Sequence, residues 1–398
     1  MNVTFASMKT IYLDNASSTP LRKEVLDAML PHLENSFGNA SSLHHKGRVA
    51  HTLLEEARHT VSSALGVKDS EIIFTSGGTE ANNLALYGVA RSYRARGTHI
   101  LLSSIEHPSI LQGGEKLSEE GFDVEYLPVD QYGRINIKDT LARIRPNTIL
   151  ISIMLANNEI GTIEPIRELS LHVQKLPEHT RPFLHTDACQ ALGQILVTPD
   201  ELGVDLMTLN SSKIYGPKGV GLLYVREGIS LIPQMVGGAQ EFGKRAGTEN
   251  IPSIIGFAQA LKLAVAEQVN QNKKHTMLRK KFLKMLKKEL PQLILNGHPE
   301  ERLPNNIHIS LPYIEGESLV LMLDTYGICA STGSACSAHN LLPSHVLRAI
   351  GQSPEVIHGS LRFTLGRDTT EEDLTYTAQA LSTCAKRLLS MSPLPLYV

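Results

Sequence analysis

Short apolar runs alternate with amphipathic stretches between residues 71 and 225. The runs are too short for helices and predict buried strands. The predicted strands cover residues 72–74, 100–103, 124–127, 149–154, 183–185, 206–209 and 220–225. Helical periodicity between several of them predicts helices at 79–96, 108–120 and 166–176. This alternation is typical of an α/β domain, in which helices cover both faces of a mostly parallel sheet.

The pattern changes after the turn at Asn296-Gly297, which a long predicted helix at 252–290 precedes. Beyond the turn, strands are predicted at 307–311, 328–330 and 361–365, and helices at 316–326 and 370–389. We therefore expect two domains. The large domain spans residues 16–260, and a smaller α+β domain combines residues 1–15 with 261–398 and carries a loop at 331–343.

The composition is that of an ordinary globular protein, with 398 residues, 42% of them hydrophobic, and a formal net charge of −2. A nearly neutral charge argues against bulk nucleic-acid binding. Residues 1–10 lack the apolar stretch of an export signal, and no apolar run approaches the ~20 residues of a membrane span. We therefore expect a cytoplasmic protein without membrane or direct nucleic-acid contacts.

Basic residues cluster at 273–288 within the long predicted helix. Among them, apolar side chains recur at helical spacing, at Leu278, Phe282, Met285 and Leu286. The pattern favours a solvated basic face backed by an apolar face on the core. A docking surface for tRNA or for an acidic partner is the alternative.

Polar or reactive residues follow several predicted strands, at 76–79, Glu106-His107, Asn157-Asn158, Asp187 and Lys213. In parallel α/β sheets, ligands lie beyond the carboxyl ends of the strands. We therefore expect these segments to converge on one crevice.

Lys213 and Asp187 suggest the chemistry of that crevice, because each follows a predicted buried strand. A lysine is rarely buried unless it is paired or reacts. An aldehyde cofactor needs a lysine that holds it as a Schiff base and an acid that keeps its pyridine nitrogen protonated. A structural Lys–Asp ion pair is the alternative.

The turn Gly77-Gly78-Thr79 joins a predicted strand to a predicted helix. Glycines let backbone N–H groups approach an anion, and a helix N-terminus carries partial positive charge. Thr79 adds a hydroxyl or caps the helix. The turn is a candidate phosphate site, with a plain strand-to-helix turn as the alternative; it matches neither the P-loop nor the dinucleotide-binding pattern.

Cys336 lies in a small, polar, glycine-containing segment at 330–343, which predicts an exposed loop. A thiol in such a loop indicates use rather than packing. We expect Cys189, Cys329 and Cys384 to be buried as small hydrophobes. The four cysteines have no paired spacing typical of a metal site, so we expect free thiols and no metal.

With these motifs in place, the chain resembles the cysteine desulfurases of the NifS/IscS type, class-V aminotransferase relatives that are pyridoxal-phosphate enzymes of fold type I. The resemblance covers nearly the whole chain. It rests on Tyr12-Leu-Asp-Asn-Ala, Phe37-Gly-Asn, Thr75-Ser-Gly-Gly-Thr-Glu, Glu106-His107, Asn157-Asn-Glu-Ile-Gly161, His185-Thr-Asp-Ala-Cys-Gln190, Lys213-Ile-Tyr-Gly-Pro-Lys-Gly, Arg245-Ala-Gly-Thr248, Gly333-Ser-Ala-Cys336 and Ser360-Leu-Arg-Phe-Thr-Leu-Gly-Arg367.

The resemblance implies roles around the cofactor ring. Lys213 matches the Schiff-base lysine, and Asp187 matches the partner of the pyridine nitrogen. Gln190 and Asn158 match residues that bind the ring oxygen. His107 matches a histidine that stacks on the ring and takes part in proton transfer.

The resemblance also implies a phosphate site. Gly78 and Thr79 match its turn, and Thr248 matches a ligand that family dimers contribute across the subunit interface. The family usually has Ser-Gly-His before the lysine, where this chain has Asn210-Ser211-Ser212. We expect Asn210 or Ser212 to replace the usual contacts.

For the substrate, the resemblance implies that Arg362 binds the carboxylate, which suits its planar fork. Asn39 and Asn158 match further substrate-binding positions. Cys336 matches the nucleophile that accepts sulfur. The chain ends soon after Ser392-Pro-Leu, without the longer tail that grips a scaffold partner in the family, so the identity of the sulfur acceptor stays open.

The resemblance therefore implies a homodimeric L-cysteine desulfurase that uses pyridoxal 5′-phosphate and gives L-alanine and a persulfide on Cys336. The sulfur would pass to a protein acceptor in iron–sulfur cluster assembly or in tRNA or cofactor thiolation. A selenocysteine lyase or another class-V aminotransferase-like enzyme is the nearest alternative. A non-catalytic sulfur-trafficking partner is an alternative of another class.

Overall fold

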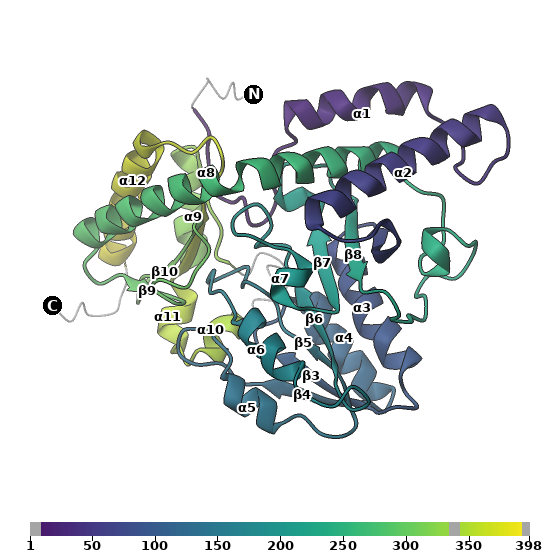
Figure 1. The fold of residues 1–398 in the computed structure, drawn as a ribbon. Coiled ribbons are helices and arrows are strands. Elements are labelled where there is room, and N and C mark those ends of the chain that lie inside the picture. The colour runs from purple at the N-terminus through teal and green to yellow at the C-terminus, as the bar shows by residue number, and fades with distance from the viewer. Residues whose placement is uncertain (1–8, 334–342, 392–398) are drawn as a thin grey trace.

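A sheet of seven strands forms the centre of the protein in a computed structural model, which describes residues 9–333 and 343–391 (Figure 1). The strand order is β2-β8-β7-β6-β5-β3-β4. The strands are β2 (Ile72–Thr75), β3 (His99–Ser103), β4 (Asp123–Leu127), β5 (Thr148–Ser152), β6 (Phe183–Asp187), β7 (Leu206–Asn210) and β8 (Gly221–Val225). The seven apolar runs predicted as strands are therefore all strands of this sheet.

The direction of the strands sets which ends meet. β8 is antiparallel to both of its neighbours, β2 and β7, and the pairs β7–β6, β6–β5, β5–β3 and β3–β4 are parallel. All strands except β8 therefore point the same way, as expected for a mostly parallel sheet. Their carboxyl ends lie at one edge, where the predicted polar segments follow them.

Helices cover both faces of the sheet, and the strand residues alternate between the two layers. Phe74 and Leu101 pack into one apolar core, whereas Ile73 and Leu102 pack into another on the opposite face. The period of two in a β-strand produces this division. The covering helices are α3 (Gly78–Ser92), α4 (Pro108–Glu119), α5 (Ile137–Ala142), α6 (Ile166–Val173), α7 (Pro199–Leu202) and the amino-terminal part of α8 (Ile251–Glu289).

Two helices in the first 65 residues were not predicted. They are α1 (Lys23–Asn35) and α2 (His45–Leu65), and both pack along α8 (Figure 1). The buried stripe of α2 is interrupted by Arg58, which obscures its apolar pattern. Arg58 is buried because it donates to Glu241 at 2.8 and 2.9 Å and to the carbonyl oxygen of Ile72 at 2.8 Å. A charged side chain is stable there because its partners satisfy it.

A smaller unit surrounds the carboxyl-terminal part of α8. Its strands are β9 (Ile294–Leu295), β10 (Asn306–Ser310) and β12 (Ser360–Thr364) in one sheet, and β1 (Ile11–Tyr12) with β11 (Ile328–Cys329) in another. Its helices are α9 (Gly316–Thr325), α10 (His345–Ala349), α11 (Pro354–His358) and α12 (Glu371–Met391). One apolar core combines Ile11 and Leu13 with Phe282 and Phe363. The large-plus-small architecture agrees with the predicted fold class.

The long helix α8 passes through residue 260 without a break. The domain boundary placed at that residue therefore stays a prediction. Within the described ranges, no helix combines the length and the hydrophobicity needed to cross a membrane.

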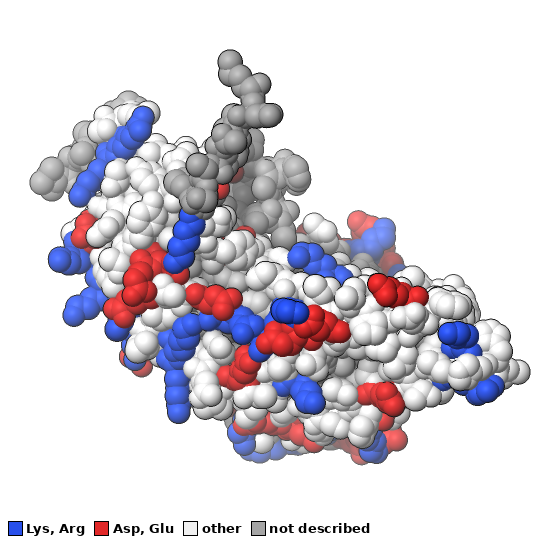
Figure 2. All heavy atoms as spheres, turned by 90° about the horizontal axis from the view of Figure 1, so that it is seen from above, with Lys and Arg blue, Asp and Glu red and all other residues white. Residues whose placement is uncertain are grey.

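The basic run at 273–288 has a mixed environment. Lys281 pairs with Glu371 at 2.6 Å. The other lysines of the run are exposed except Lys274, which is half-buried and donates to the carbonyl oxygen of Arg367. Arg279 departs from the expected solvated face, because it is buried and donates to the carbonyl oxygens of Arg302 and Leu303. Figure 2 shows basic and acidic side chains interspersed on the face seen from above. A docking role for this run stays a prediction.

One of the three cysteines that we expected to be buried differs from that expectation. Cys189 and Cys384 are buried, as predicted. Cys329 is only partly buried, because its short strand β11 has a single partner strand in the sheet. The prediction that Cys329 is buried as a small hydrophobe is therefore wrong.

Phe282 is expected to be a main support of the smaller unit. It is fully buried and meets the ring of Phe363 edge-on, with centroids 5.4 Å apart. Phe282→Ala should lower the free energy of unfolding by about 3–5 kcal/mol, because it removes apolar contacts and leaves a cavity. Leu321→Ala, at a side chain that is 70% exposed on α9, is the control and should change little. Equal urea midpoints for the two variants would contradict this role.

Candidate active site

A cavity of about 290 Å³ opens where the carboxyl ends of the strands meet the smaller unit. It is lined by Ala16, Ser17, Gly78, Thr79, Asn82, His107, Met154, Asn158, Asp187, Cys189, Gln190, Asn210, Lys213, Gly333 and Arg362. The structure therefore brings together most of the predicted site residues. Five of the six strands that share one direction, all but β4, lead into segments that contribute to this lining.

Three predicted residues do not line this cavity. Asn39 and Thr248 are exposed, and Ser212 turns toward Asn210. Cys336 lies outside the described residues. Asn39 stands between α1 and α2, where its side chain accepts a hydrogen bond from the backbone N–H of Ser41. The roles expected of these four residues stay predictions.

Lys213 ends a short 3₁₀ turn, Ser211–Lys213, that follows β7. Asn210 caps this turn by accepting from the backbone N–H of Ser212 at 3.2 Å. Gly216 lets the chain fold back closely, because a Cβ there would lie 2.1 Å from Ser211 Oγ. The Lys213 Nζ donates to the carbonyl oxygen of Ser17 at 2.6 Å. The lysine is thereby aimed into the cavity from a rigid strand end.

Asp187 is the last residue of β6 and is buried. Its carboxylate oxygens accept from the Asn82 side-chain amide at 2.7 Å and from the backbone N–H of Cys189 at 2.9 Å. Each carboxylate oxygen can accept more than one hydrogen bond, so the group can take a further donor from the cavity. Burial and the charge of Asp187 raise the pKa of the Cys189 thiol, which therefore stays protonated.

His107 caps the start of α4. Its Nδ1 accepts from the backbone N–H of Ser109 at 3.1 Å, and the Ser109 hydroxyl lies 2.8 Å away. Burial lowers the pKa of the imidazole, so the ring is neutral near pH 7. Because Nδ1 is an acceptor, the proton of the neutral ring resides on Nε2.

The turn before α3 has the close packing expected of an anion site. A Cβ at Gly78 would lie 3.0 Å from Cys189 Sγ and 3.6 Å from Asn210 Nδ2. The first N–H groups of a helix have no partner within the helix, so those of α3 are available to a ligand. Glu80 leaves them free, because it is engaged by Ser76 N at 2.8 Å and by Arg245 at 2.8 Å.

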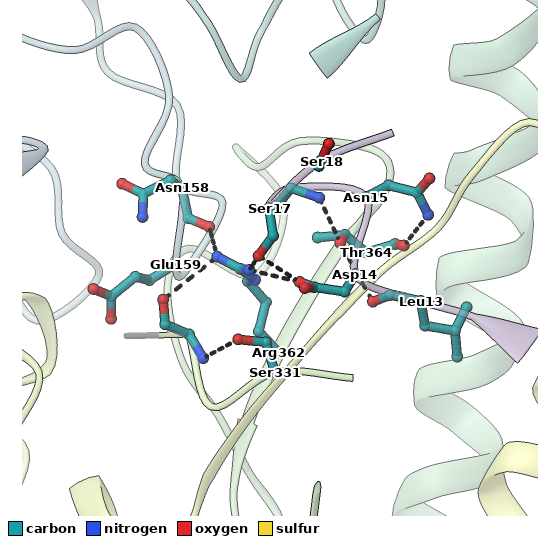
Figure 3. Close-up of polar contacts among 12 residues, drawn as sticks. Leu13, Asp14, Asn15, Ser17, Ser18, Asn158, Glu159, Ser331, Arg362 and Thr364 are labelled. Atoms are coloured by element: carbon teal, nitrogen blue, oxygen red, sulfur yellow. Dashed lines mark hydrogen bonds and ion pairs between the residues drawn. The ribbon is translucent and has the colours of Figure 1, made fainter. Parts of the chain in front are cut away.

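Arg362 approaches the cavity from β12 and is only 3% exposed. Figure 3 shows its guanidinium surrounded by Asp14, Ser17 and Asn158. It therefore carries a positive charge at the side of the cavity contributed by the smaller unit. The predicted arginine and the predicted lysine therefore line one space, and each comes from a different unit.

Sequence reasoning missed several residues of this site. Asp14 and Ser17 belong to the amino-terminal turn, and Asn82 lies on α3. A polar residue on the buried face of a helix, as at Asn82, was a signal that was not used. No local pattern connects Asp14 with Arg362, because 348 positions separate them along the chain.

Comparison with known proteins gives consistent matches. Residues 11–376 match the family described as aminotransferase class-V. Cysteine desulfurase IscS of Dictyoglomus turgidum is 50% identical over 97% of this chain and 97% of its own length. Cysteine desulfurase of Rattus norvegicus is 42% identical, with 98% and 86% covered. A solved structure described as a NifS-like protein has a TM-score of 0.89 at 35% identity, with 95% and 100% covered.

A second solved structure, described as SspA in complex with cysteine, has a TM-score of 0.77 at 34% identity, covering 89% of this chain and 99% of its own. These matches run through both units of the fold and through the residues of the cavity. The chain therefore belongs to the aminotransferase class-V family and, within it, to the cysteine desulfurases of the NifS/IscS type.

Glu106, beside His107, generates a prediction on pH dependence. It is fully buried; its Oε1 accepts from Ser103 Oγ at 2.6 Å and Met154 N at 2.7 Å, and its Oε2 has no partner among the described residues. Burial raises the pKa of this carboxyl to about 8. The folded protein keeps a proton that the unfolded chain loses near pH ~4.3, so this group lowers stability as the pH rises from about 5 to 8.

Glu106→Gln cannot ionise and keeps an Oε1 acceptor. Its free energy of unfolding, relative to the wild type, should therefore rise with pH, by at most about 1.4 kcal/mol per unit between pH 5 and 8. Glu164, whose pKa burial also raises to about 8, is present in both proteins and cancels in the difference. The exposed Glu300→Gln is the control. A difference that does not change with pH would show that Glu106 is ionised throughout.

Proposed function

We propose that this chain is an L-cysteine desulfurase that uses pyridoxal 5′-phosphate and leaves L-alanine. The observation that carries this proposal is the cavity at the sheet edge, which gathers Lys213, Asp187, His107 and Arg362 in a chain of this family. A transferase of this kind needs an amine, an acid, a proton carrier and a carboxylate-binding cation in one place. These four side chains supply them.

The residues present fit the cofactor. Lys213 offers an amine to its aldehyde, and Asp187 offers an acceptor to its pyridine nitrogen. The start of α3 offers backbone N–H groups to its phosphate, and Gly78 keeps that space open where a Cβ would meet Cys189. The side-chain amide of Asn210 lies close to Gly78. Asn210 therefore suits the phosphate contact that the family usually makes through its Ser-Gly-His segment.

The proton steps follow from the positions of these groups. When bound, pyridoxal phosphate supplies an electron-withdrawing ring that stabilises negative charge at the α-carbon of the substrate. Asp187 would hold the ring nitrogen in its protonated form by accepting its hydrogen bond. Lys213 Nζ would take the α-proton. The Nε2 side of His107 would exchange a proton with the substrate thiol.

The sulfur step is assigned to Cys336. Its thiolate would attack the substrate sulfur, so that an S–S bond forms while the C–S bond breaks and its electron pair goes to the β-carbon. Protonation of that carbon gives alanine, and the extracted sulfur remains as a persulfide on Cys336. The sulfur would then pass to a protein acceptor, an iron–sulfur scaffold or a thiolation enzyme.

The remaining predicted contacts belong to the same proposal. Asn158 and Gln190 would bind the ring oxygen, since both line the cavity. Asn39 would contact the substrate, and Ser212 would act on the phosphate through Asn210. Thr248 would bind the phosphate of a second subunit, since it is exposed and does not line the cavity of its own chain.

Cys336→Ser tests the assignment of sulfur transfer. Incubated with L-cysteine and a reductant, the wild type should release sulfide and alanine in equal amounts. The serine variant should lose alanine production by at least about 100-fold while keeping its cofactor absorbance, because a hydroxyl is not ionised near neutral pH. Mass spectrometry should find the added sulfur on Cys336 in the wild type. Added sulfur on Cys189, Cys329 or Cys384 would contradict the mechanism.

We also propose a homodimer, and one end of the molecule supports it. Large apolar side chains are exposed there on α1, in the connection to α2 and in the segment before α8 (Figure 1). They include Leu30, Leu33, Phe37, Leu43, Val236 and Phe242, with exposures of 49%, 58%, 77%, 91%, 90% and 53%. Exposed apolar groups gathered in this way mark protein interfaces. Thr248 belongs to the same region of the chain.

Val236→Asp should therefore dissociate the dimer, because it places a charge in the apolar interface. Equilibrium sedimentation at micromolar protein should show mostly monomer for this variant and dimer for the wild type. Leu321→Asp, also at an exposed leucine but on α9, is the matched control and should remain dimeric. A fully active wild-type monomer would remove the basis for the role of Thr248.

A further inference from the structure

The two terminal nitrogens of the Arg362 guanidinium are already engaged by the protein, whereas its Nε N–H is buried and has no partner among the described residues. Its Nη2 donates to Asp14 Oδ1 at 2.7 Å and to Ser17 Oγ at 2.8 Å (Figure 3). Its Nη1 donates to the carbonyl oxygens of Asn158 at 2.9 Å and Gly333 at 3.4 Å. Two N–H groups on each Nη account for these four contacts. A substrate carboxylate that binds these terminal nitrogens therefore has to displace or share one of the four contacts.

Hydrogen bonds to Thr364 on β12 fix the position of the Asp14–Ser17 turn. Asn15 Nδ2 donates to the carbonyl oxygen of Thr364 at 2.8 Å, and the backbone N–H of Ala16 donates to Thr364 Oγ1 at 2.9 Å. Ser17 Oγ also donates to Asp14 Oδ1 at 2.9 Å. The carboxylate, the hydroxyl and the guanidinium thus form a closed triangle on a fixed support.

The buried positive charge of Arg362 requires these partners. Arg362 is 3% exposed in its side chain, and a buried guanidinium without a counter-charge is costly. Asp14 forms its ion pair, with a side chain that is 20% exposed. Ser17 and Arg362 line the cavity, whereas Asp14 does not. The counter-charge therefore lies on the side of the guanidinium away from the cavity, and the hydroxyl lies at its edge.

Ser17 also contacts the other reactive side chain. Its carbonyl oxygen accepts from Lys213 Nζ, while its hydroxyl accepts from Arg362 Nη2. It therefore lies between the lysine that would hold the aldehyde of the cofactor and take the α-proton and the arginine that would hold the carboxylate of the substrate. An amino acid in this cavity must come close to Ser17.

We propose that Asp14 and Ser17 are an internal stand-in for the substrate carboxylate. In the free enzyme they neutralise and hydrogen-bond Arg362. The α-carboxylate of an incoming amino acid takes the Nη2 hydrogen now donated to Ser17, and Asp14 remains as a second, repelling carboxylate. Asp14 thereby weakens binding of both substrate and product and sets how readily alanine leaves. This inference rests on the proposed role of Arg362 in binding the substrate carboxylate.

Two ligands separate the contribution of the carboxylate to binding from that of the rest of the molecule. L-alanine and L-alaninamide share the amine and the side chain, and only the first carries the carboxylate. Their dissociation constants would be measured by titration calorimetry on the holoenzyme of the wild type, Asp14→Asn and Ser17→Ala. Asp27→Asn is the matched control, since Asp27 is an exposed aspartate on α1 that pairs with Lys23.

Asp14→Asn should bind L-alanine about tenfold more tightly, because the repulsion between two carboxylates at one guanidinium is removed. Its affinity for L-alaninamide should change by less than about twofold, since that ligand has no carboxylate. Ser17→Ala should tighten L-alanine binding by about threefold, because one N–H of Arg362 is released while the counter-charge stays. Asp27→Asn should match the wild type with both ligands.

Weaker rather than tighter binding of L-alanine by the variants would overturn the proposal. If Asp14 only orients Arg362, Asp14→Asn should weaken L-alanine binding. Should Asp14→Asn not fold, unchanged or weaker L-alanine binding by Ser17→Ala is sufficient to reject the stand-in. A wild type that binds the two ligands equally would count against Arg362 as the carboxylate site, and so against the proposed function. A wild type that prefers L-alanine, with both variants unchanged, would reject only this inference.

Discussion

The site depends on one constraint: β8 runs against the rest of the sheet and yet lies between β2 and β7. Thr75 at the end of β2 and Asn210 at the end of β7 both pair with Gly221, the first residue of β8. The turn that begins α3 and the turn that carries Lys213 are thus separated by one strand. A Cβ at Gly221 would lie 2.8 Å from Gly77 Cα, so only a glycine allows this approach. An anion at α3 and an amine at Lys213 are brought within the length of one small molecule.

The same constraint explains how much the sequence could predict. Strands such as β3 and β5 are buried on both faces and read as continuous apolar runs, and the polar residues after them mark the functional edge. Lys213, Asp187 and His107 were found in this way. The lysine and the aspartate already indicated an aldehyde cofactor, with a structural ion pair as the alternative, whereas the role of His107 came from the resemblance to a family. The pattern thus located the site and indicated its chemistry, and the family made that chemistry specific.

What could not be predicted depends on contacts between distant parts of the chain. α2 was missed because Arg58 interrupts its apolar stripe, and only Glu241, far away in sequence, explains why a charge is buried there. Asp14 and Ser17 gave no local signal for the same reason. Thr248 and Asn39 do not line the cavity of one chain, so the roles expected of them stay predictions. Long-range pairing is therefore the information that periodicity lacks.

The helix α8 has a mechanical consequence. It spans 39 residues, or about 58 Å at 1.5 Å per residue, with α1 and α2 along one part and α12 along another (Figure 1). The unit that carries Lys213 and the unit that carries Arg362 therefore both pack against the same long helix. A change in the distance between Lys213 Nζ and the Arg362 guanidinium would require α8 to bend or its packing to break. The packing of both units on one helix therefore sets the spacing of Lys213 and Arg362, and a ligand that contacts both side chains has to match that spacing.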